Sequence, residues 1–293
     1  MSRCFLVGRC NGLERRVCAE LLPEVIEASS RFQGNADAGA DTRLEIRRTD
    51  GRHELLRSSE TYDLITLEPP PPSAAGVANL YSTEFYELAG ARLNPQGLLA
   101  QWLPLPTQND HETRSLVRSF VDVFPHATLW TTELHEMLLI GSQDPLELDV
   151  STIQRRFEQP GVQTCLSEVG VPSPAALLAT YVCGRSELER YAADALPVTD
   201  NRPRIEYGPW TLPGEFQHTL RNLMANRSVP NVMNADEGSL AELSERRSTL
   251  SQFYSATLAS YEGDRESWRT AMETVLRAEP DIPYFRWFAP DDR

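Results

Sequence analysis

The chain has 293 residues and a mass of 32.9 kDa, and its 28 basic against 42 acidic residues give a net charge of −14. Such an acidic chain excludes the broad basic surface that nucleic-acid binding requires. All 28 basic residues are arginine, which excludes a P-loop lysine, a Schiff-base lysine and a lysine general base.

The sequence shows no sign of membrane insertion or secretion. No apolar run approaches the ~18 residues of a membrane span, and the apolar run near the N-terminus is too short for a signal peptide. The odd number of cysteines and the absence of a Cys-x-x-Cys pair predict free thiols in a cytoplasmic protein. The five cysteines are Cys4, Cys10, Cys18, Cys165 and Cys183.

Strand and helix patterns alternate through the first 140 residues. A near-continuous apolar run at residues 62–68 predicts a strand buried on both faces, and the prolines at 69–72 predict a rigid loop after it. The alternation predicts an α/β fold with a parallel, doubly wound sheet and a late antiparallel edge. The expected strands are 16–20, 44–46, 62–68, 98–103, 127–132 and 136–140, and the expected helices are 21–32, 53–57, one beginning at Ser82 or Thr83, and one around 116–124.

The pattern is less regular over residues 150–210 and becomes helical from about 214. Helices are expected at 151–158, 174–182 and 186–193. Further along, Trp268, Met272 and Val275 share one helical face, after a longer helix that contains Tyr254. We therefore expect two parts, an α/β domain over 1–210 and a helical extension over 211–293. The extension is predicted to be a helical hairpin, and a tetratricopeptide-like unit is one form of such a hairpin. A repeat array would need about three units of this kind.

Acidic residues follow three successive predicted strands. Glu20 ends the first, Asp50–Gly51 follows the second and Glu68 ends the third. In open α/β sheets, ligands bind beyond the carboxyl ends of the strands, so these residues predict one site for a positively charged ligand such as a polyamine or a sulfonium. Taken singly, each also fits an ordinary role, since Asp-Gly is a common turn and a terminal Glu is a common surface charge.

Several enzyme classes are not indicated. The sequence lacks the GxGxxG, GxxxxGK[ST], HExxH and GxSxG motifs, and its five histidines are dispersed. We therefore expect neither a metal site nor a nucleophile-elbow enzyme.

Several motifs occur together in one order. Residues 62–81, followed by the segments 85–88, 93–97 and 99–104, resemble the spermidine synthase (polyamine aminopropyltransferase) family, and most closely its domains that are fused to bacterial membrane segments. Residues 20–27, 50–51, 124–126 and 199–207 extend the resemblance, which covers about 16–210.

The resemblance implies a Rossmann-like, methyltransferase-type fold. It also implies aminopropyl transfer from decarboxylated S-adenosylmethionine, or another use of S-adenosylmethionine as cosubstrate, to a polyamine. Glu68 is then the catalytic candidate, and Glu20, Asp50 and Gly51 are the nucleotide-binding candidates. Tyr81 and Gln101 are candidates for the substrate side. A homodimer is a further expectation.

The sequence departs from this family at two places. The family carries an Asp after the buried strand and a second Asp three residues later, whereas this chain has Glu68 and Pro71. Proline cannot take a proton, so a catalytically inactive, regulatory relative that binds a nucleotide or polyamine is the alternative, and an S-adenosylmethionine-dependent methyltransferase is a third hypothesis. Only 15 residues precede Arg16, too few for a strand, a glycine-rich loop and a crossover helix, which predicts an N-terminal truncation.

Overall fold

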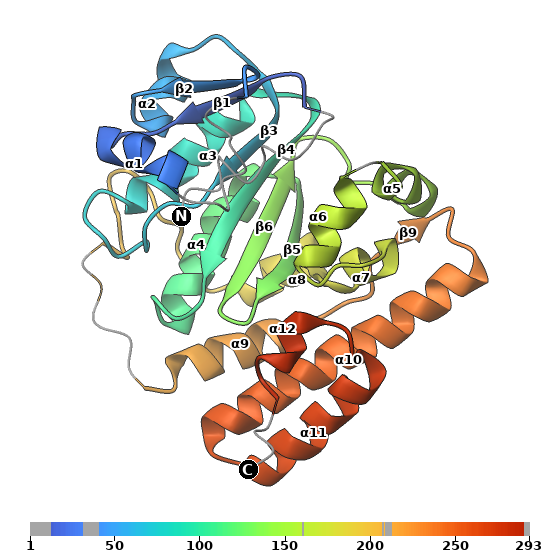
Figure 1. Ribbon diagram of the computed structural model, residues 1–293. Coiled ribbons are helices and arrows are strands. Elements are labelled where there is room, and N and C mark those ends of the chain that lie inside the picture. The colour runs from blue at the N-terminus through green and yellow to red at the C-terminus, as the bar shows by residue number, and fades with distance from the viewer. Residues whose placement is uncertain (1–12, 32–40, 160, 207, 209–212, 290–293) are drawn as a thin grey trace.

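The computed structural model describes residues 13–31, 41–159, 161–206, 208 and 213–289 (Figure 1). Cys4, Cys10, Tyr207 and the predicted boundary at 210 lie outside the described residues. The strands are β1 (Arg16–Ala19), β2 (Leu44–Arg47), β3 (Tyr62–Leu67), β4 (Leu93–Pro104), β5 (His126–Glu133), β6 (Glu136–Ser142), β7 (Leu148–Asp149), β8 (Tyr181–Gly184) and β9 (Val232–Met233). The helices are α1 (Pro23–Ala28), α2 (Gly51–Arg57), α3 (Thr83–Gly90), α4 (Asp110–Val123), α5 (Val150–Phe157), α6 (Val162–Glu168), α7 (Pro174–Ala179), α8 (Arg185–Tyr191), α9 (Glu215–Ala225), α10 (Glu237–Glu262), α11 (Arg265–Ala278) and α12 (Pro283–Arg286).

The sheet topology changes from parallel to antiparallel along the chain. β1 pairs with β2 in parallel, and the five-stranded sheet has the order β3-β4-β6-β5-β8. β3 and β4 are parallel, whereas the remaining neighbours in this sheet are antiparallel. The predicted α/β class, with its antiparallel edge and its helical C-terminal part, is confirmed. In the described part of the chain, no backbone ladder joins the β1–β2 pair to β3.

Short polar side chains begin the helices around the sheet. The Ser82 hydroxyl accepts a hydrogen bond from the Phe85 amide at 3.2 Å and caps α3. Asn109 and Glu112 form a reciprocal capping box at the start of α4. These caps satisfy amides that have no partner within their own helix. The α3 helix begins at the boundary that the sequence predicts, whereas α4 begins at Asp110, well before the expected 116–124.

An aromatic cluster fills the space between the sheet and helices α3 and α4. Tyr86 and Phe120 meet edge to face with ring centroids 5.0 Å apart, and Phe124 lies against both rings. Gly141 on β6 lies directly under the cluster, since a Cβ there would come within 2.6 Å of Phe124. A side chain at this position would therefore collide with the centre of the core.

The C-terminal helices belong to the same core. Phe253 of α10, Met272 and Val275 of α11, and Phe285 of α12 are buried in one cluster with Phe120. In Figure 1 the β1–β2 pair lies at the top, helices α10 and α11 lie at the bottom, and the five-stranded sheet lies between them.

The tip of the β5–β6 hairpin fixes these helices to the sheet. The Tyr284 hydroxyl accepts a hydrogen bond from the Leu134 amide at 2.6 Å. His135 lies 2.6 Å from the Tyr261 hydroxyl, and both rings pack against Phe216 of α9. No helix in the described ranges is both long enough and apolar enough to cross a membrane.

Three expectations about individual elements were wrong. β3 is not buried on both faces: Ile65 is its buried residue and Leu64 is 46% exposed, because β3 is the edge strand of its sheet. The helix expected at 174–182 ends at Ala179, because residues from Tyr181 onward pair with β5. The helix expected at 21–32 begins at Pro23, and a 3-10 turn follows it from Ser29.

Candidate functional site

Three predicted residues meet where β3 and β4 end. Glu68 directly follows β3, and Gln101 on β4 is in register with Leu67, the last residue of β3. Tyr81 follows the 3-10 turn Ala78–Leu80 and lies close enough to Glu68 and Gln101 for both to shift its pKa. The fold therefore brings Glu68, Tyr81 and Gln101 to one place, which we call the amine-side cluster.

Two members of the amine-side cluster, Tyr81 and Gln101, are buried and each has an unsatisfied oxygen, whereas Glu68 is exposed. Tyr81 and Gln101 have no exposed surface, and within the described residues neither the Tyr81 hydroxyl nor the Gln101 Oε1 atom has a hydrogen-bond partner within 3.5 Å. The Gln101 amide nitrogen donates to the Trp102 carbonyl at 3.1 Å, so its oxygen is the atom left over. A buried polar atom without a partner carries a desolvation penalty, and a ligand donor at this place would remove that penalty.

The surroundings of the Tyr81 hydroxyl in the amine-side cluster favour its neutral form. Burial raises the pKa of Tyr81 far above its ordinary value, and the nearby Glu68 carboxylate raises it further, whereas Gln101 acts in the opposite direction. Burial also raises the pKa of Tyr86, the Tyr81 oxygen raises it further, and the Tyr86 hydroxyl likewise has no partner among the residues described. Tyr86 is a candidate that the sequence reasoning missed, because its helical spacing indicates only a core position.

The nucleotide-side candidates lie at the carboxyl ends of β1 and β2. The amide of Glu20 donates to the Arg47 carbonyl at 3.0 Å, which brings the two strand ends together. The Glu20 carboxylate accepts from the Leu22 amide at 3.0 Å, and Asp50 accepts from the His53 amide at 2.8 Å and caps α2. A Cβ on Gly51 would lie 4.0 Å from the Cβ of Ala19, an ordinary contact.

These contacts show that Glu20 and Asp50 have local structural roles. A cap or a turn uses one carboxylate oxygen, so the second oxygen of each residue can still accept from a ligand hydroxyl or amine. Both residues share one edge of the β1–β2 pair, as predicted. Their use by a nucleotide stays a prediction.

The loop after β3 is held by backbone contacts at both ends. The Pro71 carbonyl accepts from the Ala74 amide at 2.9 Å, and the Gly76 amide donates to Glu206 at 3.1 Å. Gly76 has a φ of 75°, a conformation that glycine adopts without strain. Pro71, which stands where the family has its second Asp, is exposed on this loop and supplies no side-chain base.

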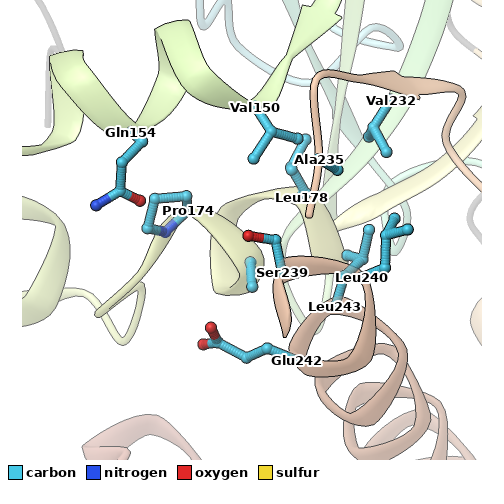
Figure 2. Close-up of a pocket in the computed structure, with 11 residues that line it drawn as sticks. Val150, Gln154, Pro174, Leu178, Val232, Ala235, Ser239, Leu240, Glu242 and Leu243 are labelled. Atoms are coloured by element: carbon cyan, nitrogen blue, oxygen red, sulfur yellow. The ribbon is translucent and has the colours of Figure 1, made fainter. Parts of the chain in front are cut away.

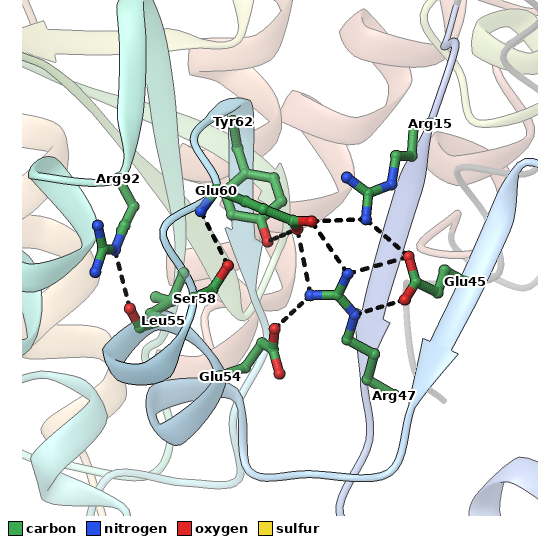
Figure 3. A network of polar contacts seen from close by, with 9 residues as sticks. All are labelled: Arg15, Glu45, Arg47, Glu54, Leu55, Ser58, Glu60, Tyr62 and Arg92. Atoms are coloured by element: carbon green, nitrogen blue, oxygen red, sulfur yellow. Dashed lines mark hydrogen bonds and ion pairs between the residues drawn. The ribbon is translucent and has the colours of Figure 1, made fainter.

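A polar network lies beside the β1–β2 pair (Figure 3). Arg47 pairs with Glu45, Glu54 and Glu60, and Arg15 donates to Glu45 at 2.8 Å and to Glu60 at 3.0 Å. The paired carboxylates hold the pKa of Arg47 well above its usual range. The network connects β2 and α2 to the residues that precede β3. Its arginines and carboxylates pair with one another, so its charges are already compensated without a ligand.

A separate small pocket of mixed polar and apolar lining lies between α5, α7 and the start of α10 (Figure 2). Its volume of about 30 Å³ equals the share of one water molecule in the liquid. Its polar lining side chains are Gln154, Ser239 and Glu242, and Glu242 already binds Ser173 and Arg246. This pocket is therefore too small for a nucleoside or a polyamine.

Known proteins resemble this chain over part of its length. A polyamine aminopropyltransferase from Nitrosomonas europaea is 29% identical over 167 residues, covering 53% of this chain and 50% of that protein. A second one, from Serratia proteamaculans, is 30% identical over 166 residues, covering 53% of this chain and 58% of that protein. The chain thus spans about half the length of the curated relatives it matches. No family model matches it.

Solved structures are similar to this chain at lower identity. The spermidine synthase from Thermotoga maritima is 17% identical and covers 63% of this chain and 62% of its own, with a TM-score of 0.46. The resemblance to the spermidine synthase family that the sequence predicts is confirmed by the curated relatives. The resemblance to membrane-fused members and the N-terminal truncation stay predictions.

Proposed function

We propose that this chain is an aminopropyltransferase-like protein that transfers an aminopropyl group from decarboxylated S-adenosylmethionine to a polyamine. The observation that carries the proposal is the pair of buried, unpartnered oxygens of Tyr81 and Gln101 beside Glu68. All three groups can accept hydrogen bonds, and an alkylammonium or amine nitrogen supplies donors. The similarity to polyamine aminopropyltransferases supports the same ligand class.

The transfer needs one proton acceptor and accurate alignment. The amine nitrogen forms a bond to the propyl carbon next to the sulfonium, and the carbon–sulfur bond breaks with its electron pair going to sulfur. The products are the alkylated amine and a neutral thioether, methylthioadenosine, and the nitrogen loses one proton. In this proposal Glu68 takes that proton, while Tyr81 and Gln101 orient the nitrogen.

The nucleotide half of the proposal rests on the β1–β2 edge. The free carboxylate oxygens of Glu20 and Asp50 would accept from the ribose hydroxyls and the adenine amine, and Gly51 would let the base approach the backbone. S-adenosylmethionine itself is the alternative cosubstrate. In this proposal the nucleotide is a cosubstrate, and no cofactor is permanently bound.

A binding protein without catalysis is the second candidate. Pro71 favours it, because proline provides no base at the position where the family has its second Asp. The two candidates share both ligands and differ only in turnover. A methyltransferase on the same fold is the third, and it would release S-adenosylhomocysteine in place of methylthioadenosine.

Ligand binding and turnover can be measured separately. We expect methylthioadenosine at ~100 times its Kd to stabilise the protein by about 2.7 kcal/mol in a thermal-shift titration. Release of methylthioadenosine from decarboxylated S-adenosylmethionine and putrescine would then be followed by chromatography. Glu68→Gln should abolish turnover, whereas Glu87→Gln, at an exposed position on α3, should leave it unchanged.

The outcomes separate the candidates. Binding with turnover that depends on Glu68 supports the transferase. Binding of both ligands without turnover supports the binding protein. A well-folded sample that binds neither methylthioadenosine nor putrescine would overturn the proposal.

A further inference from the structure

A tight turn between β8 and α9 presents one carboxylate to two distant segments. Thr199 and Arg202 exchange backbone hydrogen bonds of 3.3 and 3.0 Å, and Asp200 lies at the tip of this turn. The two Asp200 oxygens accept from the Arg52 guanidinium at 2.8 and 2.5 Å, and the Ser82 hydroxyl donates to the same carboxylate at 2.7 Å. We call Thr199–Arg202 the Asp200 turn.

The two partners of Asp200 adjoin the two halves of the candidate site. Arg52 directly follows Gly51 in the first turn of α2, on the nucleotide side. Ser82 directly follows Tyr81 and caps α3, on the amine side. Arg52 also donates to the Asn79 carbonyl at 2.8 Å, within the 3-10 turn that precedes Tyr81. One carboxylate thus contacts both segments that carry the proposed ligand contacts.

The ion pair between Arg52 and Asp200 is bidentate and only partly exposed. The side chains of Arg52 and Asp200 are 20% and 35% exposed, and the guanidinium lowers the pKa of the Asp200 carboxyl. A bidentate arginine–carboxylate pair of this kind fixes geometry more strongly than a single hydrogen bond. In the described ranges no backbone ladder joins β1–β2 to the five-stranded sheet, so side chains must set the spacing of the two halves.

We propose that Asp200 is a positioning residue that couples the nucleotide side to the amine side, so that a ligand bound at one side tightens binding at the other. This inference rests on the proposed function for the identity of the two ligands. The coupling is reciprocal: any factor by which putrescine lowers the Kd of methylthioadenosine is the factor by which methylthioadenosine lowers the Kd of putrescine.

The test compares Asp200→Ala, Asp200→Asn and a control, Asp194→Ala, at an exposed position of the same connecting region. Calorimetry gives the Kd of methylthioadenosine with and without saturating putrescine. We expect a coupling factor of about five or more in the unaltered protein and in the control, and a factor near one in Asp200→Ala. Asp200→Asn keeps an acceptor oxygen for Ser82 and should give an intermediate factor.

Hydrogen–deuterium exchange supplies a readout that needs no ligand. Asp200→Ala should speed the exchange of amides in residues 76–84 while leaving those of α4 unchanged, and circular dichroism checks that each variant is folded. A coupling factor near one in the unaltered protein, or an unchanged factor in Asp200→Ala, would overturn the inference. If the unaltered protein binds neither ligand, the proposed function fails. The exchange result alone then supports or overturns the role of Asp200 in holding the two segments together.

Discussion

Replacing Tyr81 by phenylalanine should stabilise the ligand-free protein while weakening its binding of an amine. The Tyr81 side chain has no exposed surface, and its hydroxyl has no hydrogen-bond partner among the described residues. Phenylalanine keeps the ring and removes only this oxygen. The expected gain arises because the hydroxyl loses its water on folding and recovers no bond.

The magnitude follows from the cost of a buried, unsatisfied polar group, which is about 1–3 kcal/mol. A gain of this size corresponds to a rise in Tm of about 2–4 °C per kcal/mol for a chain of roughly this length. For binding, the loss of one hydrogen bond to a charged nitrogen, about 1.5–3 kcal/mol, should raise the Kd for putrescine about 10- to 100-fold.

Tyr191 supplies the matched control. It is also buried, but its hydroxyl donates to the Asp110 carboxylate at 2.8 Å. Tyr191→Phe should therefore lower the free energy of unfolding by about 1–3 kcal/mol, the opposite sign. Urea unfolding at constant pH measures both variants. If Tyr81→Phe loses stability as Tyr191→Phe does, the hydroxyl is already bonded in the free protein and the argument for a ligand donor fails.

Three further outcomes are expected. Gly141→Ala should cost about 1–3 kcal/mol, because its Cβ would lie 2.6 Å from the Phe124 ring, and urea denaturation that shows no loss would contradict this packing. Cys183, buried and with a pKa raised to about 12, should stay unmodified by a thiol reagent at pH 8, as peptide mapping can check. The pKa of Asp200 is lowered in the folded protein, so its ion pair with Arg52 stabilises the fold fully above about pH 5. This contribution is lost as the pH falls through the folded-state pKa of Asp200. The difference in free energy of unfolding between the unaltered protein and Asp200→Asn should therefore shrink in acid.

Periodic patterns predicted most elements because their signals are local. The apolar runs that form β3, β5 and β6 and the boundary at Ser82 are all contained within a few residues. β8 could not be found in this way. Residues 175–182 are apolar enough to continue a helix, and the strand exists because Cys183 pairs with Leu129, which is distant in sequence.

The site was predictable in part for the same reason. Strand-end geometry alone grouped Glu68 with Glu20 and Asp50. Tyr81 and Gln101 were candidates only through the resemblance to the spermidine synthase family, because nothing in their local pattern places them beside Glu68. The contact of Asp200 with two distant segments was not predictable, because its partners Ser82 and Arg52 lie 118 and 148 positions away in sequence. The exposure of Leu64 likewise depended on knowing that β3 has a neighbour on one edge only.

The shared core also constrains the order in which the chain can fold during synthesis. Phe120 is translated well before Phe253 and Phe285, yet all three belong to one buried cluster. The sheet region therefore leaves the ribosome with part of its apolar surface uncovered, and that surface is closed only after more than a hundred further residues have been added. Domain-by-domain folding during translation is thus unsuited to this chain, and a gene cut near residue 210 should yield an aggregating product.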